Sequence, residues 1–458
     1  MSKIILHVRP WNNQFMLNLA EQLINLNGYD EVVFLTMFSE CNDFFKNKKR
    51  NIILLPELID DVIIDEKRLE QIDDLLFKDN VCLNDILETE RFYSKNSYDE
   101  KYFYQFALLL DKIIDKNTLN ISLTLDHFVY SFSARLTNVK KGLNYAFIPV
   151  GVPYNSVVAL RDSWNVRVNK INQRKIKKNS LKDRLNRPSS ERLVYMQKVK
   201  KPNIFNSHSK RVIKYLKKDF KIKNYLNDVG FSWSEKIYKK IFSGIKKNYH
   251  TSSLNTLSNH LNKKFVYIPL HLEPEATVIL YSTYFQNQIE MARIIAKVLP
   301  YGWEIIVKEN PKMMGIRNKE FYKTFNELPN VRFISQSIES SELIKKSQIV
   351  VSLSGTASLE AYLLDKPAIL FGTPPHHKLL KYSGYGVNFL ISDLYEIFRS
   401  KLKLSDFYND LEWDNYVAAT LPFNMIPKRN NIDQLRLDLE ENPPEYFSSF
   451  IRETLSNE

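Results

Sequence analysis

The chain has few cysteines and few glycines for its length. Two cysteines, Cys41 and Cys82, among 458 residues cannot build a disulfide framework or a cysteine-rich zinc site, and they indicate thiols in a reducing compartment. Only 11 glycines argue against a glycine-rich loop for a cofactor, so we expect none. No window approaches the ~20 consecutive apolar residues of a membrane span, and the first residues lack a signal peptide's apolar stretch. We expect a soluble, cytoplasmic protein.

The length of the chain exceeds what one ordinary hydrophobic core needs. It fits two domains of roughly 150–200 residues each. An apolar content of 44% with 26% charged residues is typical of globular proteins.

The net charge of +13 is concentrated in one segment. Residues 165–201 contain thirteen lysines and arginines but only two acids. Such a segment attracts phosphate-rich partners: anionic lipid headgroups, nucleic acid or a polyanionic glycan. It is equally compatible with a solvated connector. Since no RNA- or DNA-reading motif accompanies it, we expect no nucleic acid, and a basic nucleic-acid-binding protein stays as the alternative of another class.

Strand-like and helix-like segments alternate in the first third of the chain. Residues 4–8 and 31–37 are apolar and strand-like, and 14–26 between them have helical spacing. This βαβ pattern predicts a parallel sheet. The alternation continues with further segments at 51–55, 103–114, 121–125 and 145–150.

A second alternating region predicts another doubly wound α/β domain. It holds five strand-like segments separated by helical ones, at 265–270, 303–307, 331–334, 349–353 and 368–371. The fold class is therefore α/β, with two Rossmann-like domains facing a cleft and a basic helical connector. We expect an N-terminal acceptor domain (1–164), the connector (165–262), a C-terminal ligand-binding domain (263–391) and a helical tail (392–458).

The most informative segment follows the strand 349–353. Ligands of parallel sheets bind outside the carboxyl ends of the strands, and here Ser354, Gly355 and Thr356 begin a helix. A helix start offers free N–H groups to a phosphate, the hydroxyl of Ser358 adds a donor, and Gly355 lets the backbone approach the ligand. Glu360, one turn on from Thr356, suits the hydroxyls of a ribose. The alternative is ordinary capping by Ser and Thr.

Two other strands of this domain end in polar turns. Lys308, Glu309, Asn310 and Pro311 follow the strand 303–307. Lys308 suits a diphosphate or a leaving phosphate, and Asn310 suits a base or a phosphate. The same four residues also make an ordinary turn.

His271, Glu273 and Glu275 follow the strand 265–270, and either contact substrate hydroxyls or start a helix. No His, Cys or Asp spacing resembles a metal site, so we predict no metal. His376 and His377 lie in a loop beyond a further strand, where exposed histidines are favoured over a lid.

In the first domain, Asp126 and His127 follow the strand-like segment 121–125. They are our candidates for the catalytic base, because transfer to a hydroxyl needs a carboxylate or histidine within hydrogen-bond reach. An N-cap is the alternative. His7 and Arg9, after the first strand, face the same cleft and are possible substrate contacts.

The stretch 267–372 resembles the carboxyl-terminal domain of bacterial capsule-polysaccharide glycosyltransferases, including the Kdo-transferase and sialyltransferase-like GT-B enzymes. The residues that carry the resemblance are 269–275, Gln288, 299–300, 307–311, 330–331, 343–344, 354–356, 359–361, 366–367 and 371–372.

The resemblance implies a donor site for a nucleotide sugar, CMP- or UDP-linked. It assigns the nucleotide to Lys308, Asn310 and Pro311, and its phosphate to the turn at Ser354, with Gly355, Thr356 and Glu360. One departure is that the family's histidine before the proline is Asn310 here, which donates a hydrogen bond but carries no proton near neutral pH.

We therefore expect a metal-independent glycosyltransferase that moves a sugar from a nucleotide donor to a glycan acceptor such as a growing capsule or other cell-surface polysaccharide. The basic connector would hold it against the inner face of the membrane. A nucleotide-sugar 2-epimerase is the alternative of similar architecture, and it would need no acceptor.

Overall fold

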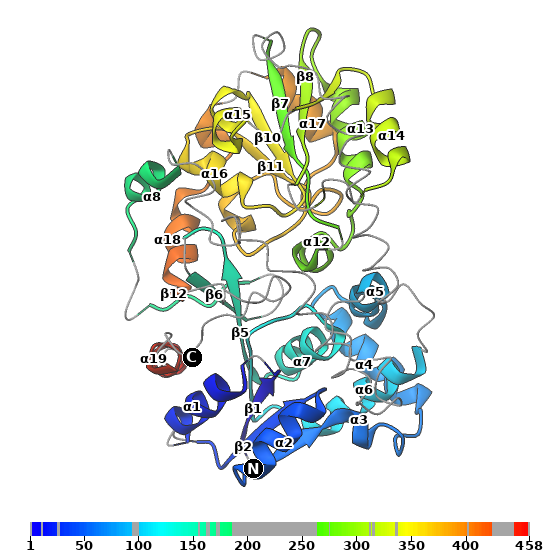
Figure 1. The fold of residues 1–458 in the computed structure, drawn as a ribbon, viewed down its shortest axis with the longest axis vertical. Coiled ribbons are helices and arrows are strands. Elements are labelled where there is room, and N and C mark those ends of the chain that lie inside the picture. The colour runs from blue at the N-terminus through cyan, green and yellow to red at the C-terminus, as the bar shows by residue number, and fades with distance from the viewer. Residues whose placement is uncertain are drawn as a thin grey trace, which may run out of the picture.

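The computed structural model describes residues 2–423 and 444–456, apart from 11, 25–27, 94–99, 154–155, 162–164, 171–174, 186–262, 274, 311–312, 314–316, 335–337 and 401–402. In this part of the chain two sheets, each with helices packed around it, form two domains stacked along the long axis of the molecule (Figure 1).

The first sheet has the strand order β12-β6-β5-β4-β1-β2-β3. The five strands from β5 to β3 pair in parallel, whereas β6 and β12 are antiparallel to their neighbours. The strands are β1 (Lys3–Val8), β2 (Glu31–Thr36), β3 (Ile52–Leu54), β4 (Thr118–Ser122), β5 (Leu143–Val150), β6 (Ser156–Leu160) and β12 (Thr420–Pro422).

Both faces of this sheet are covered by helices, as expected for a parallel sheet. Alternate residues of β1 serve the two faces: Ile4 and Leu6 join one apolar cluster, and Ile5 joins the other. The helices of this domain are α1 (Asn13–Leu23), α2 (Ser39–Asn47), α3 (Leu55–Leu58), α4 (Glu66–Phe77), α5 (Leu83–Tyr93), α6 (Glu100–Ile113) and α7 (Phe128–Val139).

The second sheet is parallel throughout, with the order β11-β10-β7-β8-β9. Its strands are β7 (Phe265–Pro269), β8 (Glu304–Lys308), β9 (Val331–Phe333), β10 (Ile349–Ser352) and β11 (Ala368–Leu370). The elements around it are α12 (Ala276–Tyr281), α13 (Gln288–Val298), α14 (Lys319–Glu327), α15 (Ser340–Lys346), α16 (Ala357–Leu363), η3 (His377–Leu379), α17 (Ile391–Arg399), η4 (Leu404–Asp406) and α18 (Asp410–Ala418).

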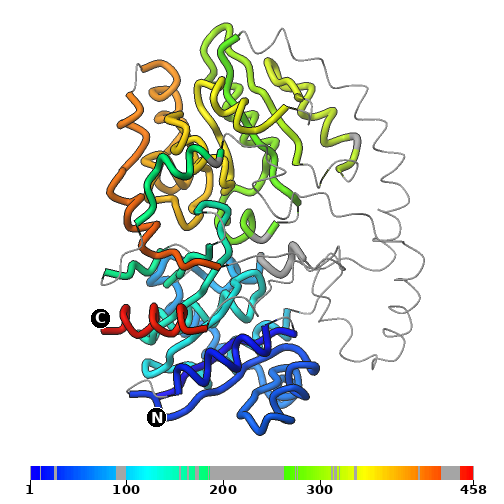
Figure 2. The backbone as a smooth tube through the Cα atoms, turned by 60° about the vertical axis from the view of Figure 1, so that its left-hand side comes forward, coloured from blue at the N-terminus to red at the C-terminus, as the bar shows by residue number. Residues whose placement is uncertain are grey.

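The C-terminal region returns to the first domain. We expected a helical tail over 392–458, and helices do dominate its described part, but β12 within it pairs with β6. The last helix, α19 (Pro444–Leu455), packs against α1 through Phe447 and Phe15, whose ring centroids are 5.0 Å apart. Figure 2 shows α19 in red beside α1 in blue. Sequence patterns do not reveal this return, because β12 is only three residues long.

Most of the predicted connector, residues 186–262, lies outside the described residues. Its helix α8 (Lys178–Leu185) lies on the second domain, where Lys178 and Lys182 bind Asp365 at 2.9 and 2.5 Å. Part of the basic excess is thus neutralised by the protein itself.

The predicted fold class, two Rossmann-like α/β domains of the GT-B type, is confirmed by the two sheets. One strand is displaced from its expected position. The apolar run 121–125 extends past the end of β4 at Ser122, because Leu123 and Leu125 are buried in the loop that follows.

Candidate functional site

The second sheet changes direction between β7 and β10. The chain passes from β7 to β8 and β9 on one side and to β10 and β11 on the other, so a crevice is expected outside the carboxyl ends of β7 and β10. His271 follows β7, and Ser354 to Thr356 follow β10. The order of strands therefore brings together two of the segments that we predicted from sequence.

His271 joins the ends of these two strands. Its Nε2 lies 3.0 Å from the Ser352 hydroxyl and 3.4 Å from the Ser354 amide. Its Nδ1 lies 3.2 Å from a Glu275 carboxylate oxygen. The Ser352 hydroxyl also accepts the Gly355 N–H at 3.0 Å. The imidazole is buried and fixes the turn after β10 from beneath.

The turn is open on its outer side. Thr356 is exposed and Gly355 half-buried, whereas Ser354 is 6% exposed and its Oγ has no hydrogen-bond partner. A buried hydroxyl without a partner is costly, so a ligand group that reached the Ser354 Oγ would gain a hydrogen bond there. A Cβ on Gly355 would lie 2.8 Å from the Ser352 Oγ and 3.0 Å from the His271 ring, so a glycine is required there.

Ser358 and Glu360 are buried within α16. The Ser358 hydroxyl lies 2.9 Å from the Gly355 carbonyl and 2.8 Å from His376 Nε2. Our expectation that His376 is exposed was wrong: it is 5% exposed, and burial, followed by the charge of His377, lowers its pKa to about 3. The loop after β11 therefore helps to hold α16.

The Lys308 ammonium forms hydrogen bonds with other groups of the protein. It donates to the Ile338 carbonyl at 2.5 Å and to the Ser340 hydroxyl at 3.3 Å. Asn310 is half-buried, and its backbone N–H donates to the Glu309 carboxylate at 2.7 Å. Pro311 lies outside the described residues.

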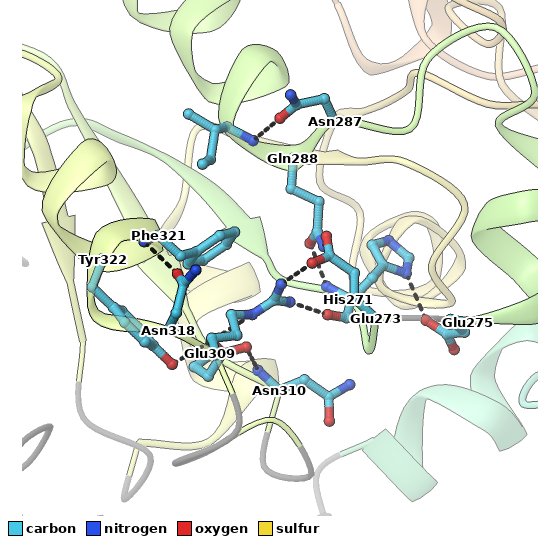
Figure 3. Close-up of polar contacts among 12 residues, drawn as sticks. His271, Glu273, Glu275, Asn287, Gln288, Glu309, Asn310, Asn318, Phe321 and Tyr322 are labelled. Carbon is cyan, nitrogen blue, oxygen red and sulfur yellow. Dashed lines mark hydrogen bonds and ion pairs between the residues drawn. The ribbon is translucent and has the colours of Figure 1, made fainter. Parts of the chain in front are cut away.

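Arg317 is a residue of this site that sequence reasoning missed. Its guanidinium donates to Glu309 at 2.9 Å and also binds Glu273 and the His271 carbonyl. These three partner residues are labelled in Figure 3. Gln288 bridges the same loops, because it accepts the His271 amide at 2.7 Å and donates to Glu273. No pattern around Arg317 distinguished it from a surface arginine.

The Glu309 carboxylate has a second partner in Tyr322, whose hydroxyl donates at 2.8 Å. Burial raises the pKa of Glu309, and Arg317 and Tyr322 limit that rise. The turns after β7 and β8 are thus held in one buried ionic network.

The first sheet has its own change of direction, between β1 and β4. There Arg9 binds Asp126 at 2.9 Å and lies 4.6 Å from the ring centroid of Tyr130. Burial opposes ionisation of Asp126, but Arg9 first, then His127 and Thr124, outweigh it and lower its pKa to about 2. Such a carboxylate is a weak base, whereas His127 is half-buried at the start of α7.

His7 is the first member of a directional hydrogen-bond chain. The Arg161 carbonyl can only accept, so Asn144 donates to it at 2.7 Å and accepts from Asn120 at 2.7 Å. Asn120 must then accept from His7 Nε2 at 2.8 Å, which leaves Nδ1 with a lone pair. This Nδ1 is buried without a partner, and burial, with Arg9 as a smaller contribution, lowers the pKa of His7 to about 4.

The domains meet near the turn after β10. A Cβ on Gly151, which follows β5, would lie 2.9 Å from the Thr356 methyl group. The Tyr416 hydroxyl of the second domain donates to the Val152 carbonyl at 2.6 Å. Burial first, and then the Asp126 carboxylate of the first domain, raise the pKa of Tyr281 at the end of α12.

Within the described ranges, no three His, Cys, Asp or Glu side chains gather as a metal ion would require; metal independence stays a prediction. None of the helices that the structure describes has the length and apolar character needed to cross a bilayer.

Several solved structures are similar to the chain at low identity. KpsC of Thermosulfurimonas dismutans, a β-Kdo 2,7 transferase, is 14% identical, with 79% of this chain and 91% of that chain covered and a TM-score of 0.32. HepE of Anabaena, in complex with UDP and glucose, is 11% identical over 100% of both chains, with a TM-score of 0.29.

The UDP-GlcNAc 2-epimerase of Neisseria meningitidis, bound to UDP-GlcNAc, is 13% identical over 100% and 99% of the two chains, with a TM-score of 0.25. Likenesses this low carry no argument about activity. No curated protein matches the chain at a significant level.

A family model does match. Residues 167–387 fit the model of capsule polysaccharide biosynthesis proteins, which confirms the resemblance predicted from the motifs between 267 and 372. The matched segment includes the turn after β10 and the network around Arg317. What the match shows is similarity to capsule polysaccharide biosynthesis proteins over residues 167–387, a little under half of the chain.

Proposed function

We propose that the chain is a glycosyltransferase that moves a sugar from a nucleotide-sugar donor, CMP- or UDP-linked, to a growing capsule or other cell-surface polysaccharide. The match to the model of capsule polysaccharide biosynthesis proteins supports a role in the synthesis of such a polysaccharide. The observation that carries the donor site is the Ser354 hydroxyl, which is buried without a partner in the turn after β10.

In this reaction an acceptor hydroxyl bonds to the anomeric carbon, the bond from that carbon to the nucleotide's phosphate breaks, and the hydroxyl proton passes to a base. The leaving phosphate gains negative charge, which hydrogen-bond donors stabilise. The hydroxyls of Ser354 and Thr356 are suited to this role, because one lacks a partner and the other is exposed. Lys308 would support the turn, because its ammonium binds the Ile338 carbonyl and the Ser340 hydroxyl, and Glu360 would do so from within α16.

The base would come from the first domain. Asp126 is held as a carboxylate by Arg9, so of the predicted pair His127 is the better candidate, with Asp126 and Arg9 orienting the acceptor. We propose no metal in these steps and no tightly bound cofactor, and a cytoplasmic location on the inner face of the membrane.

Nucleotide binding to the Ser354 region is the first property to test. Calorimetric titration with CMP, UDP and GDP should identify one that binds the wild type. Ser354→Ala should then weaken the binding of that nucleotide on the order of tenfold, which corresponds to one lost hydrogen bond to a charged group. Thermal stability should stay equal or rise, because the variant removes an unsatisfied buried hydroxyl.

Ser133→Ala is the matched control. Its hydroxyl is also buried without a partner, but it lies on α7 of the first domain, so its nucleotide affinity should equal that of the wild type. Equal affinity in the Ser354 variant would refute this donor site. A sugar epimerised at C2 and formed from the donor alone would identify an epimerase instead of a transferase.

A further inference from the structure

We propose that His271 is a positioning residue of the nucleotide site, and that its Nε2 holds the turn from Ser352 to Gly355 in the shape that binds phosphate. This inference rests on the proposed function. His271 need not touch the nucleotide itself, because it lies beneath the turn and is 6% exposed.

The partners of the imidazole fix its tautomer. A Glu275 carboxylate oxygen lies 3.2 Å from Nδ1, so Nδ1 carries the proton and donates. In the neutral ring Nε2 then has a lone pair, which accepts the Ser352 O–H at 3.0 Å and, more weakly, the Ser354 N–H at 3.4 Å. The Ser352 oxygen in turn accepts the Gly355 N–H at 3.0 Å. Every bond is consistent with this direction.

The backbone of His271 is held as firmly as its ring. Its amide donates to Gln288 at 2.7 Å, and its carbonyl accepts from Arg317. The ring therefore has no free direction in which to swing, and the position of Nε2 is set by the network around Arg317. Because Nε2 accepts from the Ser354 amide, the network helps to position the backbone of Ser354.

The two ring nitrogens have separable roles, and two substitutions separate them. A glutamine at 271 can place its amide oxygen near the position of Nε2, where it accepts from Ser352 and Ser354. An asparagine is shorter and reaches only the position of Nδ1. There it keeps the bond to Glu275, but it cannot make the contacts of Nε2 with Ser352 and Ser354. If the turn is what matters, His271→Gln should preserve nucleotide binding and His271→Asn should not.

The test is calorimetric titration of both variants with whichever of CMP, UDP or GDP binds the wild type. We expect His271→Gln to stay within about threefold of the wild-type Kd and His271→Asn to weaken it on the order of tenfold. Ser352→Ala removes the contact with His271 from the other side, together with the acceptor of the Gly355 N–H, so its loss of affinity should be at least that of His271→Asn. It also keeps the test decisive if the asparagine variant does not fold.

The double variant with His271→Asn and Ser352→Ala separates positioning from general damage. Two residues that act through one contact give a non-additive effect, so the double variant should bind about as well as Ser352→Ala alone. Additive losses, or wild-type affinity in both single variants, would overturn the inference. Wild-type protein that binds none of the three nucleotides would instead refute the proposed function.

Discussion

At the scale of single residues, buried histidines give the protein a specific sensitivity to acid. His7 and His376 are 2% and 5% exposed, and burial lowers their pKa values to about 4 and about 3. Both are neutral when folded at pH 5, whereas histidine in the unfolded chain is protonated below about pH 6.5. The unfolded state then binds more protons, so stability falls as the pH falls.

The pH dependence of stability follows from these values. As the pH falls from 6.5 to 4, the lowered pKa of His7 alone should decrease the free energy of unfolding by about 3 kcal/mol. His7→Gln removes the titration and can keep the bond to Asn120, so its stability should fall less over this range. Urea unfolding at pH 7 and pH 4.5, followed by tryptophan fluorescence, measures the difference.

His7→Asn serves as the comparison, because it removes the titration but cannot reach Asn120. It should be less stable than the glutamine variant at pH 7. Its free energy of unfolding should change between pH 7 and pH 4.5 as little as that of the glutamine variant. Parallel acid profiles of wild type and His7→Gln would contradict the assignment of a buried neutral imidazole.

At the scale of elements, the network around Arg317 ties the turns after β7 and β8 together. Glu273 belongs to the first turn and Glu309 to the second, and both bind this guanidinium. Arg317 is 5% exposed and Glu309 7%. Removing only one partner of an ion pair this deeply buried strongly destabilises the fold, because the other charge stays buried without compensation.

Arg317→Met should therefore destabilise the second domain by about 3–5 kcal/mol, because it leaves the Glu309 carboxylate buried without its cation. The expected result is a lower melting temperature and weaker nucleotide binding. Arg293→Met is the matched control: this arginine pairs with Glu290 on the half-exposed side of α13, and such surface pairs contribute roughly 0–1 kcal/mol. Similar losses in both variants would contradict the assigned role.

At the scale of the whole molecule, the chain crosses between its domains more than once. The first domain approaches the candidate donor site through Gly151, beside Thr356. The C-terminal region crosses back and adds β12 and α19 to the first domain. The two domains are thus joined by the main chain on one side and by the contact beside Thr356 at the site.

Gly151→Ala tests the close approach of the domains. Its Cβ would lie 2.9 Å from the Thr356 methyl group, closer than carbon atoms pack, so the domain contact must shift at a cost of about 1–3 kcal/mol. We expect slower sugar transfer with little change in nucleotide affinity, measured by transfer assay and calorimetry. Adding Thr356→Ser, which removes that methyl group but keeps the hydroxyl, should restore the rate; failure to restore it would contradict a steric cause.

Local patterns in the amino-acid sequence were enough to predict most strands and helices and the segments that carry chemistry. Periodicity identified the strands of the second sheet, because parallel strands are buried on both faces and appear as apolar runs. The segment after β10 was recognisable because a strand, a glycine and hydroxyl residues follow one another in the chain.

Which of those segments meet depends on how the chain folds in three dimensions. The order of strands brings His271 to Ser352, 81 positions away, and a buried arginine with no surrounding pattern joins Glu273 to Glu309. The tertiary structure also showed that Lys308 is used within the protein and that Asp126 is held by Arg9. Sequence patterns report contacts between near neighbours, whereas pairing between distant segments depends on how both domains pack, and no local spacing encodes that.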